Sequence, residues 1–190
     1  MENLSYDNQI FEKVIYAGKT ISGKNFQDCT FRGCDFSNAD FARNVFVDCV
    51  MEDCNLSLIK LHSTTLNNVT FKNCKVMGVN FSEVQDFLFN VSFDNCLLDY
   101  ASFMRKKMLK TNFIKSSLKD SSFVQTNLTG SVFHECDMSG TIFNKTDLTA
   151  TNFITAYNYT IDPELNNMKK ASFSAAGVLG LLSKYQIRIV

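Results

Sequence analysis

Hydrophobic side chains recur at every fifth position over most of this 190-residue chain. From Leu88 to Phe153 every fifth residue is Leu, Phe or Met, and fourteen such matches in a row have a chance probability on the order of 10⁻⁵ in a chain that is 45% apolar. An α-helix needs repeats of three and four residues, and a flat strand needs alternation in twos. A period of five fits neither, so the chain is predicted to turn a corner within each repeat.

A second inward position lies two residues before each of these central residues. The side chain there is small or apolar almost throughout, and all seven cysteines fall at this position. This predicts a buried site with room for a compact side chain, where cysteine acts as a small hydrophobe. The same period governs an earlier run from Phe26 to Phe81. The step of seven from Phe81 to Leu88 places two extra residues in the segment 82–87, or seven if regular coiling resumes only at Phe93, and predicts a loop or bulge.

Several segments carry a resemblance to a known family. CDFSNADF (34–41), TNLTGSVF (126–133) and CDMSGTIF (136–143) resemble the pentapeptide-repeat family, whose motif is roughly A(D/N)LXX. The resemblance covers residues 11–153. It implies an all-β fold, a right-handed quadrilateral β-helix in which four repeats form one square coil of about 20 residues. A C-terminal helix and a short strand are expected to follow.

Within such coils, the alternation of Phe with Leu or Met predicts two columns of stacked rings. One column would contain Phe93, Phe113, Phe133 and Phe153, and the opposite column would contain Phe103, Phe123 and Phe143. At inward positions these rings are expected to form the core rather than a ligand site.

The chain divides into three predicted segments. Residues 1–25 form an N-terminal cap and the first imperfect repeats, because a stacked array needs a polar end. Residues 26–173 form the β-helix with its break at 82–87. Residues 174–190 form a C-terminal element, in which Ser174 caps a helix to about Lys184 and the alternation of Ile187 and Ile189 predicts a strand.

The C-terminal element is expected either to cap the open end of the coil or to dock on a second copy. AGVLGLLSKYQIRIV (176–190) resembles the dimerisation element of pentapeptide-repeat proteins of the quinolone-resistance type (Qnr and MfpA). This resemblance implies a homodimer through the C-terminus. The candidate interface residues are Val178, Leu179, Leu181, Leu182, Tyr185, Ile187 and Ile189.

Charge and composition narrow the functional classes. Lys plus Arg and Asp plus Glu both number 19, so the net charge is zero, and no direct binding to nucleic acid or membrane is expected. The balance is nevertheless −5 over residues 1–100 and +5 over residues 101–190. Without an apolar run of membrane-spanning length or a signal-peptide pattern, a cytoplasmic protein is expected. The sequence has no C-x-x-C pair, which argues against a structural zinc site. Cysteines 20 residues apart, such as Cys29 and Cys49, would stack within the distance range of a disulfide, but parallel ladder side chains and a reducing cytoplasm favour free thiols.

The basic excess of the second half is concentrated around residues 105–119. It comprises Arg105, Lys106, Lys107, Lys110, Lys115 and Lys119. Lys106 falls at the small inward position, where a buried ammonium is costly without a partner, so the corner is expected to distort until Lys106 reaches water. The cluster is interpreted either as a solvated charge run or as a contact for an anion or a partner.

The chain is expected to be a non-catalytic protein-interaction module without cofactor or metal. His62 and His134 fall at outward positions with no nucleophile beside them in sequence. The family resemblance implies a DNA mimic that binds DNA gyrase or topoisomerase IV and affects quinolone sensitivity. The alternative is a scaffold that binds another protein without DNA mimicry, which the neutral net charge and the short break favour.

The candidate partner-binding residues comprise the acidic side chains of the first half and two phenylalanines at the break. The acidic residues are Asp28, Asp35, Asp40, Asp48, Glu52, Asp53, Asp94 and Asp99. Phe87 and Phe89 neither occupy nor continue the count of fives. They are expected either to cover a gap in the core or to form an exposed contact patch.

Overall fold

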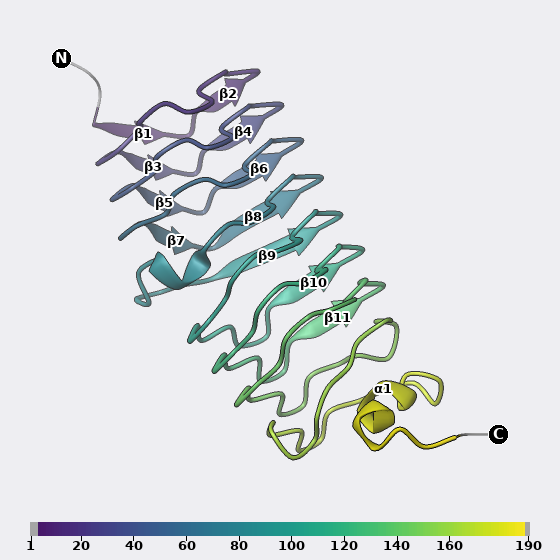
Figure 1. Cartoon of the computed structure of the whole chain (residues 1–190). Coiled ribbons are helices and arrows are strands. Elements are labelled where there is room, and N and C mark those ends of the chain that lie inside the picture. Colours follow the sequence, from purple (N-terminus) through teal and green to yellow (C-terminus); the bar gives the residue numbers. More distant parts are fainter. Residues whose placement is uncertain (1–3, 189–190) are drawn as a thin grey trace.

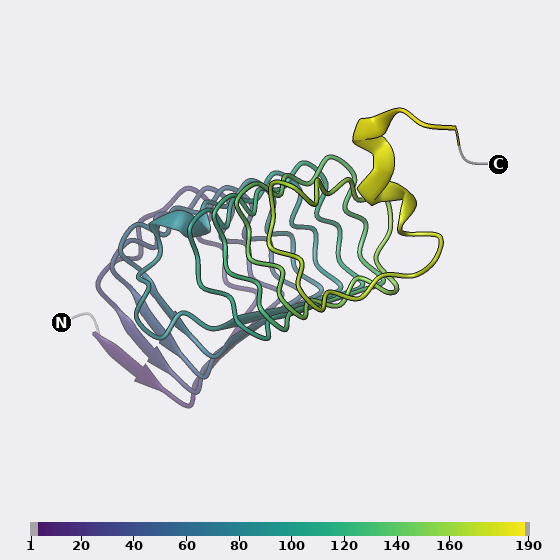
Figure 2. The same ribbon diagram turned by 90° about the horizontal axis from the view of Figure 1, so that it is seen from below.

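The computed structural model describes residues 4–188 as a right-handed square β-helix whose coils stack into a rod. Figure 1 shows the coils following one another from the N-terminus to the C-terminus, and Figure 2 shows the square path of the chain nearly end-on. Most backbone hydrogen bonds run between coils, as from the Phe36 N–H to the Asn55 carbonyl at 2.8 Å, and others close turns within a coil, as from the Ala39 N–H to the Phe36 carbonyl at 3.0 Å. The predicted fold class is confirmed.

Two sides of the square carry parallel sheets of short strands. The first sheet has the order β1 (Ser5–Asp7), β3 (Asn25–Gln27), β5 (Val45–Val47) and β7 (Thr65–Asn67). The second has the order β11 (Val132–His134), β10 (Asn112–Ile114), β9 (Val91–Asp94), β8 (Val69–Lys72), β6 (Val50–Glu52), β4 (Thr30–Arg32) and β2 (Ile10–Glu12). The other two sides are joined by single parallel bridges, such as Asp35 to Asn55 and Asp40 to Lys60.

The pairing register locates the irregularity in the repeat. Partners in successive coils are 20 residues apart, as in Phe26 with Phe46, but Val69 pairs with Val91, which is 22 residues later. The spacing returns to 20 between Phe113 and Phe133. Two residues are therefore inserted, and they lie after the short 3-10 helix η1 (Phe81–Glu83).

The prediction that Leu88 is the first central residue after the break was wrong. The Gln85 N–H donates to the Thr64 carbonyl with an N···O distance of 2.8 Å, which is an ordinary hydrogen bond. The spacing of about 20 residues between coils therefore continues past Phe81. Asp86, and not Leu88, then stands at the central place. Leu88 is 55% exposed, with the left-handed φ of 57° found at the other corners. Phe89 and Asn90 are the two extra residues.

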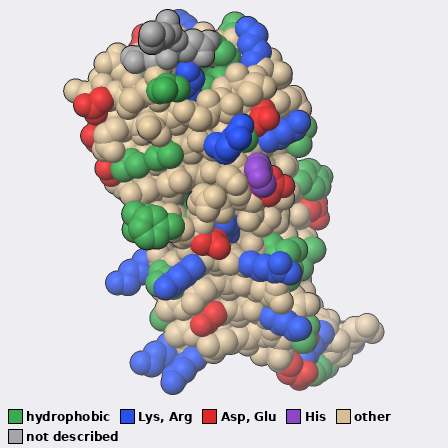
Figure 3. Space-filling model, turned by 90° about the vertical axis from the view of Figure 1, so that its left-hand side faces the viewer, with side chains coloured by type: hydrophobic (Ala, Val, Ile, Leu, Met, Phe, Trp, Pro, Cys, Tyr) green, Lys and Arg blue, Asp and Glu red, His purple; other side chains and the backbone are tan. Residues whose placement is uncertain are grey.

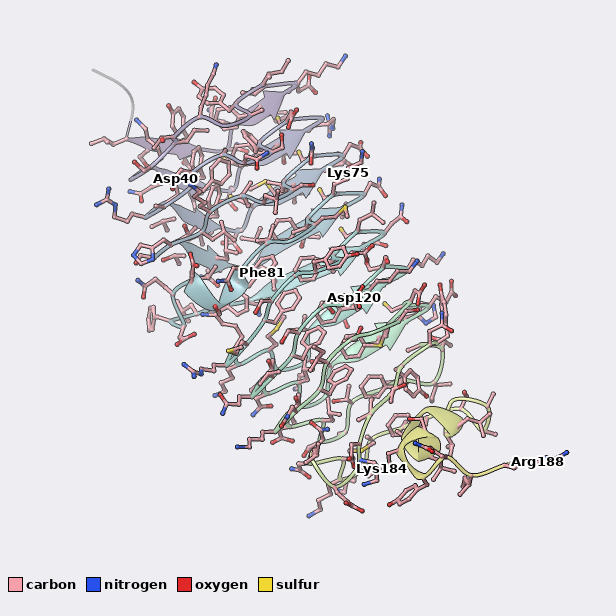
Figure 4. The ribbon with its side chains drawn as sticks, viewed as in Figure 1. Asp40, Lys75, Phe81, Asp120, Lys184 and Arg188 are labelled. Atoms are coloured by element: carbon pink, nitrogen blue, oxygen red, sulfur yellow. The ribbon has the colours of Figure 1, made fainter. Side chains whose placement is uncertain are left out.

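The interior matches the predicted columns. Phe113 stacks on Phe93 and Phe133 with ring centroids 5.3 and 4.7 Å apart, and it meets Phe123 edge-to-face at 5.7 Å. These are favourable geometries for aromatic pairs. Figure 4 shows Phe81 inside the coil, at the head of the Phe103 column. The opposed Phe columns are thus core, as predicted.

The seven cysteines are buried and free. Each of the seven thiols lies near a backbone carbonyl of the preceding coil, as Cys49 Sγ does with Phe26 O at 3.4 Å. Burial raises the pKa of the Cys49 thiol to about 11 and that of Cys136 to about 11. These two thiols are therefore protonated at neutral pH. Within residues 4–188 no group of three or more His, Cys, Asp or Glu side chains is arranged to hold a metal ion.

The two ends of the rod differ. At the N-terminal end, the first coil pairs in register with the second, and Tyr6 and Phe11 stack on Phe26 and Phe31. A hollow of about 590 Å³ lies beside these rings at the open end. At the other end the chain folds back in a helical segment, visible in yellow in Figures 1 and 2.

The C-terminal helix is shorter than the sequence predicts. The helical residues are α1 (Leu179–Leu182) and the 3-10 turn η2 (Ser183–Tyr185), rather than 174–184. Ser174 Oγ does accept the Gly177 N–H at 3.0 Å, but this bond closes a turn that precedes the helix. Ile187 lies in no strand, and Ile189 lies outside the described residues. In the part of the chain described, no helix is long and apolar enough to cross a membrane.

Candidate functional site

The loop 84–90 is the principal departure from the regular surface of the rod. Its tip, which we define as Phe87 and Leu88, is exposed by 78% and 55% respectively. A turn closed by the Phe89 N–H and the Asp86 carbonyl at 3.3 Å forms the tip. An exposed aromatic ring beside an exposed leucine is a typical protein-contact feature.

A buried lysine of the next coil holds this loop. The Lys106 side chain is 2% exposed, and its Nζ lies 2.6 Å from Asp86 Oδ1. The same ammonium donates a hydrogen bond to the Val84 carbonyl and lies 5.3 Å from the centre of the Phe89 ring. These contacts fix the loop on both sides of the tip. The expectation that Lys106 reaches water was wrong, because the loop supplies a carboxylate, a carbonyl and an aromatic face.

Comparison with the other coils explains why a lysine fits there. In the same column of several other coils, a short polar side chain donates to a carbonyl of the preceding coil. Thr64 Oγ1 donates to Phe41 O at 2.8 Å, and Thr126 Oγ1 donates to Phe103 O at 2.8 Å. Lys106 instead extends to the Val84 carbonyl and to Asp86, both in loop 84–90, which a short side chain would not reach together.

The two phenylalanines of the break have different environments. Phe89 is half-buried, packs against the core and lies 6.5 Å from the Phe81 ring. It covers the gap that the insertion opens in the core. Phe87 makes no ring contact with another described aromatic residue and is exposed. Each of the two interpretations therefore holds for one residue, and only Phe87 is available to a partner.

The structure does not bring the eight acidic residues together on one face. Asp28 and Asp48 lie at the corner that follows β3 and β5, and Asp40 lies on a different side, in the bridge to Lys60. Figure 4 shows Asp40 and Lys75 on opposite flanks of the rod. Asp35 lies on the side that carries Lys75, because Asp35 bridges to Asn55 and Asn55 bridges in turn to Lys75.

Basic residues interrupt the acidic ones along the second sheet. Arg32 lies between Glu12 and Glu52 of the neighbouring coils, with N···O distances of 3.1 and 2.8 Å. In the next two coils Lys72 is paired in register with Asp94. Asp53, at the following corner, accepts a hydrogen bond from Asn73 Nδ2 at 3.1 Å. This side presents alternating charges.

Some of the acidic side chains accept hydrogen bonds from backbone N–H groups. Asp35 Oδ1 accepts the Ser37 N–H at 3.0 Å, and this bond lowers the pKa of the Asp35 carboxyl. Asp40 Oδ1 accepts the Ala42 N–H at 2.9 Å in the same way. Asp99 Oδ1 accepts the Lys119 N–H of the next coil at 3.1 Å. These carboxylates are therefore partly committed to turns and to coil stacking.

The candidate interface residues of the C-terminus lie on both sides of the helical segment. Leu181 packs against the core, whereas Leu179, Tyr185 and Ile187 are 51%, 53% and 56% exposed. Leu179 and Leu182 border a shallow hollow of about 200 Å³ with Ile187. Val178 is 39% exposed. The element thus both covers the end of the coil and leaves an outward apolar ridge.

Two acidic residues hold this element in place. Lys184 Nζ lies 2.7 Å from Asp162 Oδ1 and 2.9 Å from Glu164 Oε2. Hydrogen bonding to Lys184 is the main cause that lowers the pKa of both carboxyls, and the same bonds raise the pKa of Lys184. Figure 4 shows Lys184 on the helical segment beside the last coil. These contacts could not be predicted from the period of five, because residues 162–164 interrupt the repeat.

The chain belongs to the pentapeptide-repeat family. A family model for a pentapeptide repeat region matches residues 24–103, and a model for eight copies of the pentapeptide repeat matches residues 116–153. Together the two matches span more than half of the chain. No curated protein sequence matches it.

Solved structures of known pentapeptide-repeat proteins share the fold. A trypsin-treated variant of QnrB1, a plasmid-mediated fluoroquinolone resistance protein, is similar with a TM-score of 0.77 at 14% identity, and the match covers 99% of both chains. Full-length QnrB1 gives a TM-score of 0.63 at 14% identity over 96% of this chain and 100% of that one. HetL, a regulator of heterocyst differentiation in the cyanobacterium Nostoc, gives 0.54 at 13% identity over 90% of both chains.

Proposed function

We propose that this protein is a non-catalytic interaction module of the cytoplasm that binds a protein partner through the tip of loop 84–90. The observation that carries the proposal is the contrast between an exposed Phe87 and the buried Lys106 that holds its loop. An exposed aromatic side chain on a fixed loop can bind a partner with little loss of conformational entropy. The proposal has no catalytic step, and it needs neither metal nor cofactor.

Photo-crosslinking tests this function. The photoreactive residue p-benzoylphenylalanine would replace Phe87 in cells that make the protein, and Tyr157 would be replaced as a control. Tyr157 is 49% exposed and lies on another side of the rod, in the bridge to Asp137. We expect one defined protein adduct at position 87 that excess wild-type protein competes away. Equal adducts at both positions, or none at position 87, would contradict the proposal.

A type II topoisomerase is the second candidate, as the partner of the same module. Its support is the likeness to QnrB1, which covers 99% of both chains and is described as a fluoroquinolone resistance protein. Arg32, Lys60 and Lys72 interrupt the acidic residues, so the described surface has no continuous acidic stripe there. Topoisomerase binding by DNA mimicry is therefore less well supported than topoisomerase binding by another contact.

A supercoiling assay tests the second candidate. Purified DNA gyrase would be assayed with and without ciprofloxacin, at micromolar concentrations of this protein. Inhibition without the drug, or protection against the drug, would support topoisomerase binding, and Phe87→Ala should weaken either effect. If the protein neither inhibits gyrase nor protects it at any concentration tested, the topoisomerase is ruled out as the partner, and the general proposal still stands.

We further propose that two copies associate through the C-terminal ridge. The exposed side chains of Val178, Leu179 and Ile187, together with the hollow beside Leu182, support this proposal. A two-fold contact at this end would bury apolar surface and would leave both loops 84–90 free.

A further inference from the structure

Six basic residues gather on one side of the second half of the rod. They surround the column of central residues Met108, Leu128, Leu148 and Met168, and we call them the basic face. The basic face comprises Arg105, Lys107, Lys110, Lys145, Lys169 and Lys170. The register of the coils sets this arrangement. Figure 3 views the rod from the left of Figure 1, and blue side chains outnumber red ones over its lower half.

The left-handed corners bracket this side. Arg105 and Lys145 have φ of 63° and 54° at one corner, and Lys110 and Lys170 have φ of 54° and 60° at the other. Lys107 stands between the corners, in a bridge with Asn127 that continues to Asp147. Coils stack about 4.8 Å apart. Equivalent side chains one coil apart are therefore neighbours, and Arg105 and Lys145 lie two coils apart, at about 10 Å, whereas Lys110 and Lys170 lie three coils apart, at about 14 Å.

The charges of the basic face are not neutralised within the chain. None of the six forms an ion pair with a described residue, and Arg105 Nε donates only to the neutral Gln125 Oε1, at 3.1 Å. Lys106, in contrast, is paired with Asp86 and is not part of the face. Asp147 is the acidic residue within the face, and its Oδ1 is occupied by Thr149 and Asn167. The positive charges therefore add to one local field.

Apolar side chains border the face at its upper edge. Leu109 is 44% exposed between Lys107 and Lys110, in the coil that follows the tip. Lys106 joins that coil to loop 84–90, so the tip and the first three cations of the face form one rigid unit. A partner that binds the tip is thereby brought next to the cations.

We infer that the partner presents an acidic protein segment with an apolar residue, which lies across the basic face and against the tip. This inference rests on the function proposed above and specifies the chemistry of its partner. Carboxylates would pair with Lys107 and Lys110, while the apolar residue would contact Leu109 and Phe87. The inferred attraction has the opposite sign to that of a DNA mimic, whose partner presents a basic surface.

A protein segment fits this surface better than a nucleic acid does. Asp147 interrupts the cations, and the Asp86 carboxylate is 83% exposed at the upper edge, so a segment with a few spaced carboxylates can pair with the cations and avoid both aspartates, whereas a continuous phosphate backbone cannot. Nucleic-acid sites on proteins combine phosphate-binding cations with little opposing charge. The exposed tip and Leu109 add an apolar contact that a phosphate backbone does not use.

Two matched double variants test the inference. Lys107→Glu with Lys110→Glu reverses two charges of the face. Lys75→Glu with Lys115→Glu makes the same change in net charge on other sides of the rod, where Lys75 bridges to Leu97 and Lys115 follows β10. Both doubles would first be checked for an unchanged circular dichroism spectrum. Each would then carry the photoreactive residue at position 87.

Loss of crosslinking in one double only is the expected result. We expect the yield of the adduct at position 87 to fall about fivefold or more in the face double and less than about twofold in the control double. An equal yield in both doubles would overturn the inference and leave the proposed function intact. No adduct in the wild-type background would instead overturn the proposed function itself.

Fluorescence anisotropy provides a readout that does not depend on the cellular partner. The probes would be a fluorescein-labelled peptide of glutamates around one leucine, and a labelled DNA duplex of about 20 base pairs, each at about 0.15 M salt. We expect the peptide to bind more tightly than the duplex and to be weakened by the face double alone. Tighter binding of the duplex, equal loss in both doubles, or no peptide binding would each overturn the inference.

Discussion

Lys106 Nζ lies 2.6 Å from Asp86 Oδ1, although the lysine side chain is 2% exposed and the aspartate side chain 83%. Both residues stand at positions that face inward elsewhere in the rod. Asp86 occupies a central place and Lys106 the small place before Met108. Each would be unfavourable alone, and together they form an ion pair whose lysine end is shielded from water. The pair lets the repeat absorb two inserted residues without opening the core.

Removing this lysine should release the loop. Lys106→Thr gives the residue type found at Thr64 and Thr126, but its short side chain would not reach both Asp86 and the Val84 carbonyl. We expect a loss of about 1–3 kcal/mol in the free energy of unfolding. We also expect much faster chymotrypsin cleavage at Phe87 and Leu88. Peptide mapping by mass spectrometry would locate the cut.

A neighbouring lysine provides the control for that variant. Lys107→Thr removes the same charge from an exposed position in the same coil, and its cleavage rate should equal that of the wild type. If Lys106→Thr and Lys107→Thr are cut equally slowly, then Lys106 does not hold the loop.

The inward columns can be tested at one of their fully buried rings, Phe123. Phe123 is fully buried between Phe103 and Phe143, with ring centroids at 4.9 and 5.4 Å. Phe123→Asp places an unpaired carboxylate there and should unfold the rod, since Phe→Ala changes alone cost about 3–5 kcal/mol. Phe123→Leu should remain folded with a lowered melting temperature, because leucine fills equivalent places such as Leu118. Thermal melts followed by circular dichroism would show both results, and an unchanged melting temperature for Phe123→Asp would refute the assignment.

The period of five predicts the fold because every central residue has the same surroundings. Phe113 and Phe123 could therefore be placed in opposed columns from the count alone. The break could not, since Leu88 and Phe89 are both apolar and only the bond from Gln85 to Thr64 shows which register the chain keeps. The basic face was equally hidden, because Lys110 and Lys170 come onto one side of the rod only through the stacking of coils.

The helix was predicted too long for a different reason. Apolar residues at helical spacing from Val178 onward are compatible with a start at Ser174. The chain instead makes turns there, which bring Gly177 and Gly180 against Tyr159. A Cβ on Gly180 would lie 2.2 Å from the Tyr159 carbonyl oxygen. Tertiary contact of this kind overrides local helical preference, and a single sequence does not show it.

The C-terminal ridge predicts a concentration-dependent dimer. Leu179→Glu places a charge on its exposed part and should give a monomer without unfolding the rod, because Leu179 is 51% exposed. Light scattering after size-exclusion chromatography would measure the mass. Leu165→Glu is a matched control, since Leu165 is 50% exposed in the preceding excursion. A wild-type protein that is monomeric at high micromolar concentration would contradict the dimer.

The ion pairs of Lys184 should make the position of the C-terminal element depend on pH. Hydrogen bonds from Lys184 lower the pKa of Asp162 and Glu164, so these carboxyls stabilise the attached state above their ordinary pKa values. That contribution is lost as the pH falls through the lowered values, below about pH 4. The pKa of Lys184 is raised, so its contribution to stability is lost in the other direction, as the pH rises into strong alkali.

Nuclear magnetic resonance can follow this detachment residue by residue. Between about pH 7 and pH 3, the amide signals of Leu181 and Tyr185 should shift together, while that of Phe133 in the core should stay in place. Lys184→Met removes both ion pairs, so its Leu181 and Tyr185 signals should already lie near the acid positions at neutral pH. If the wild type and Lys184→Met titrate alike, the ion pairs do not hold the element, and packing of Leu181 against the core holds it alone.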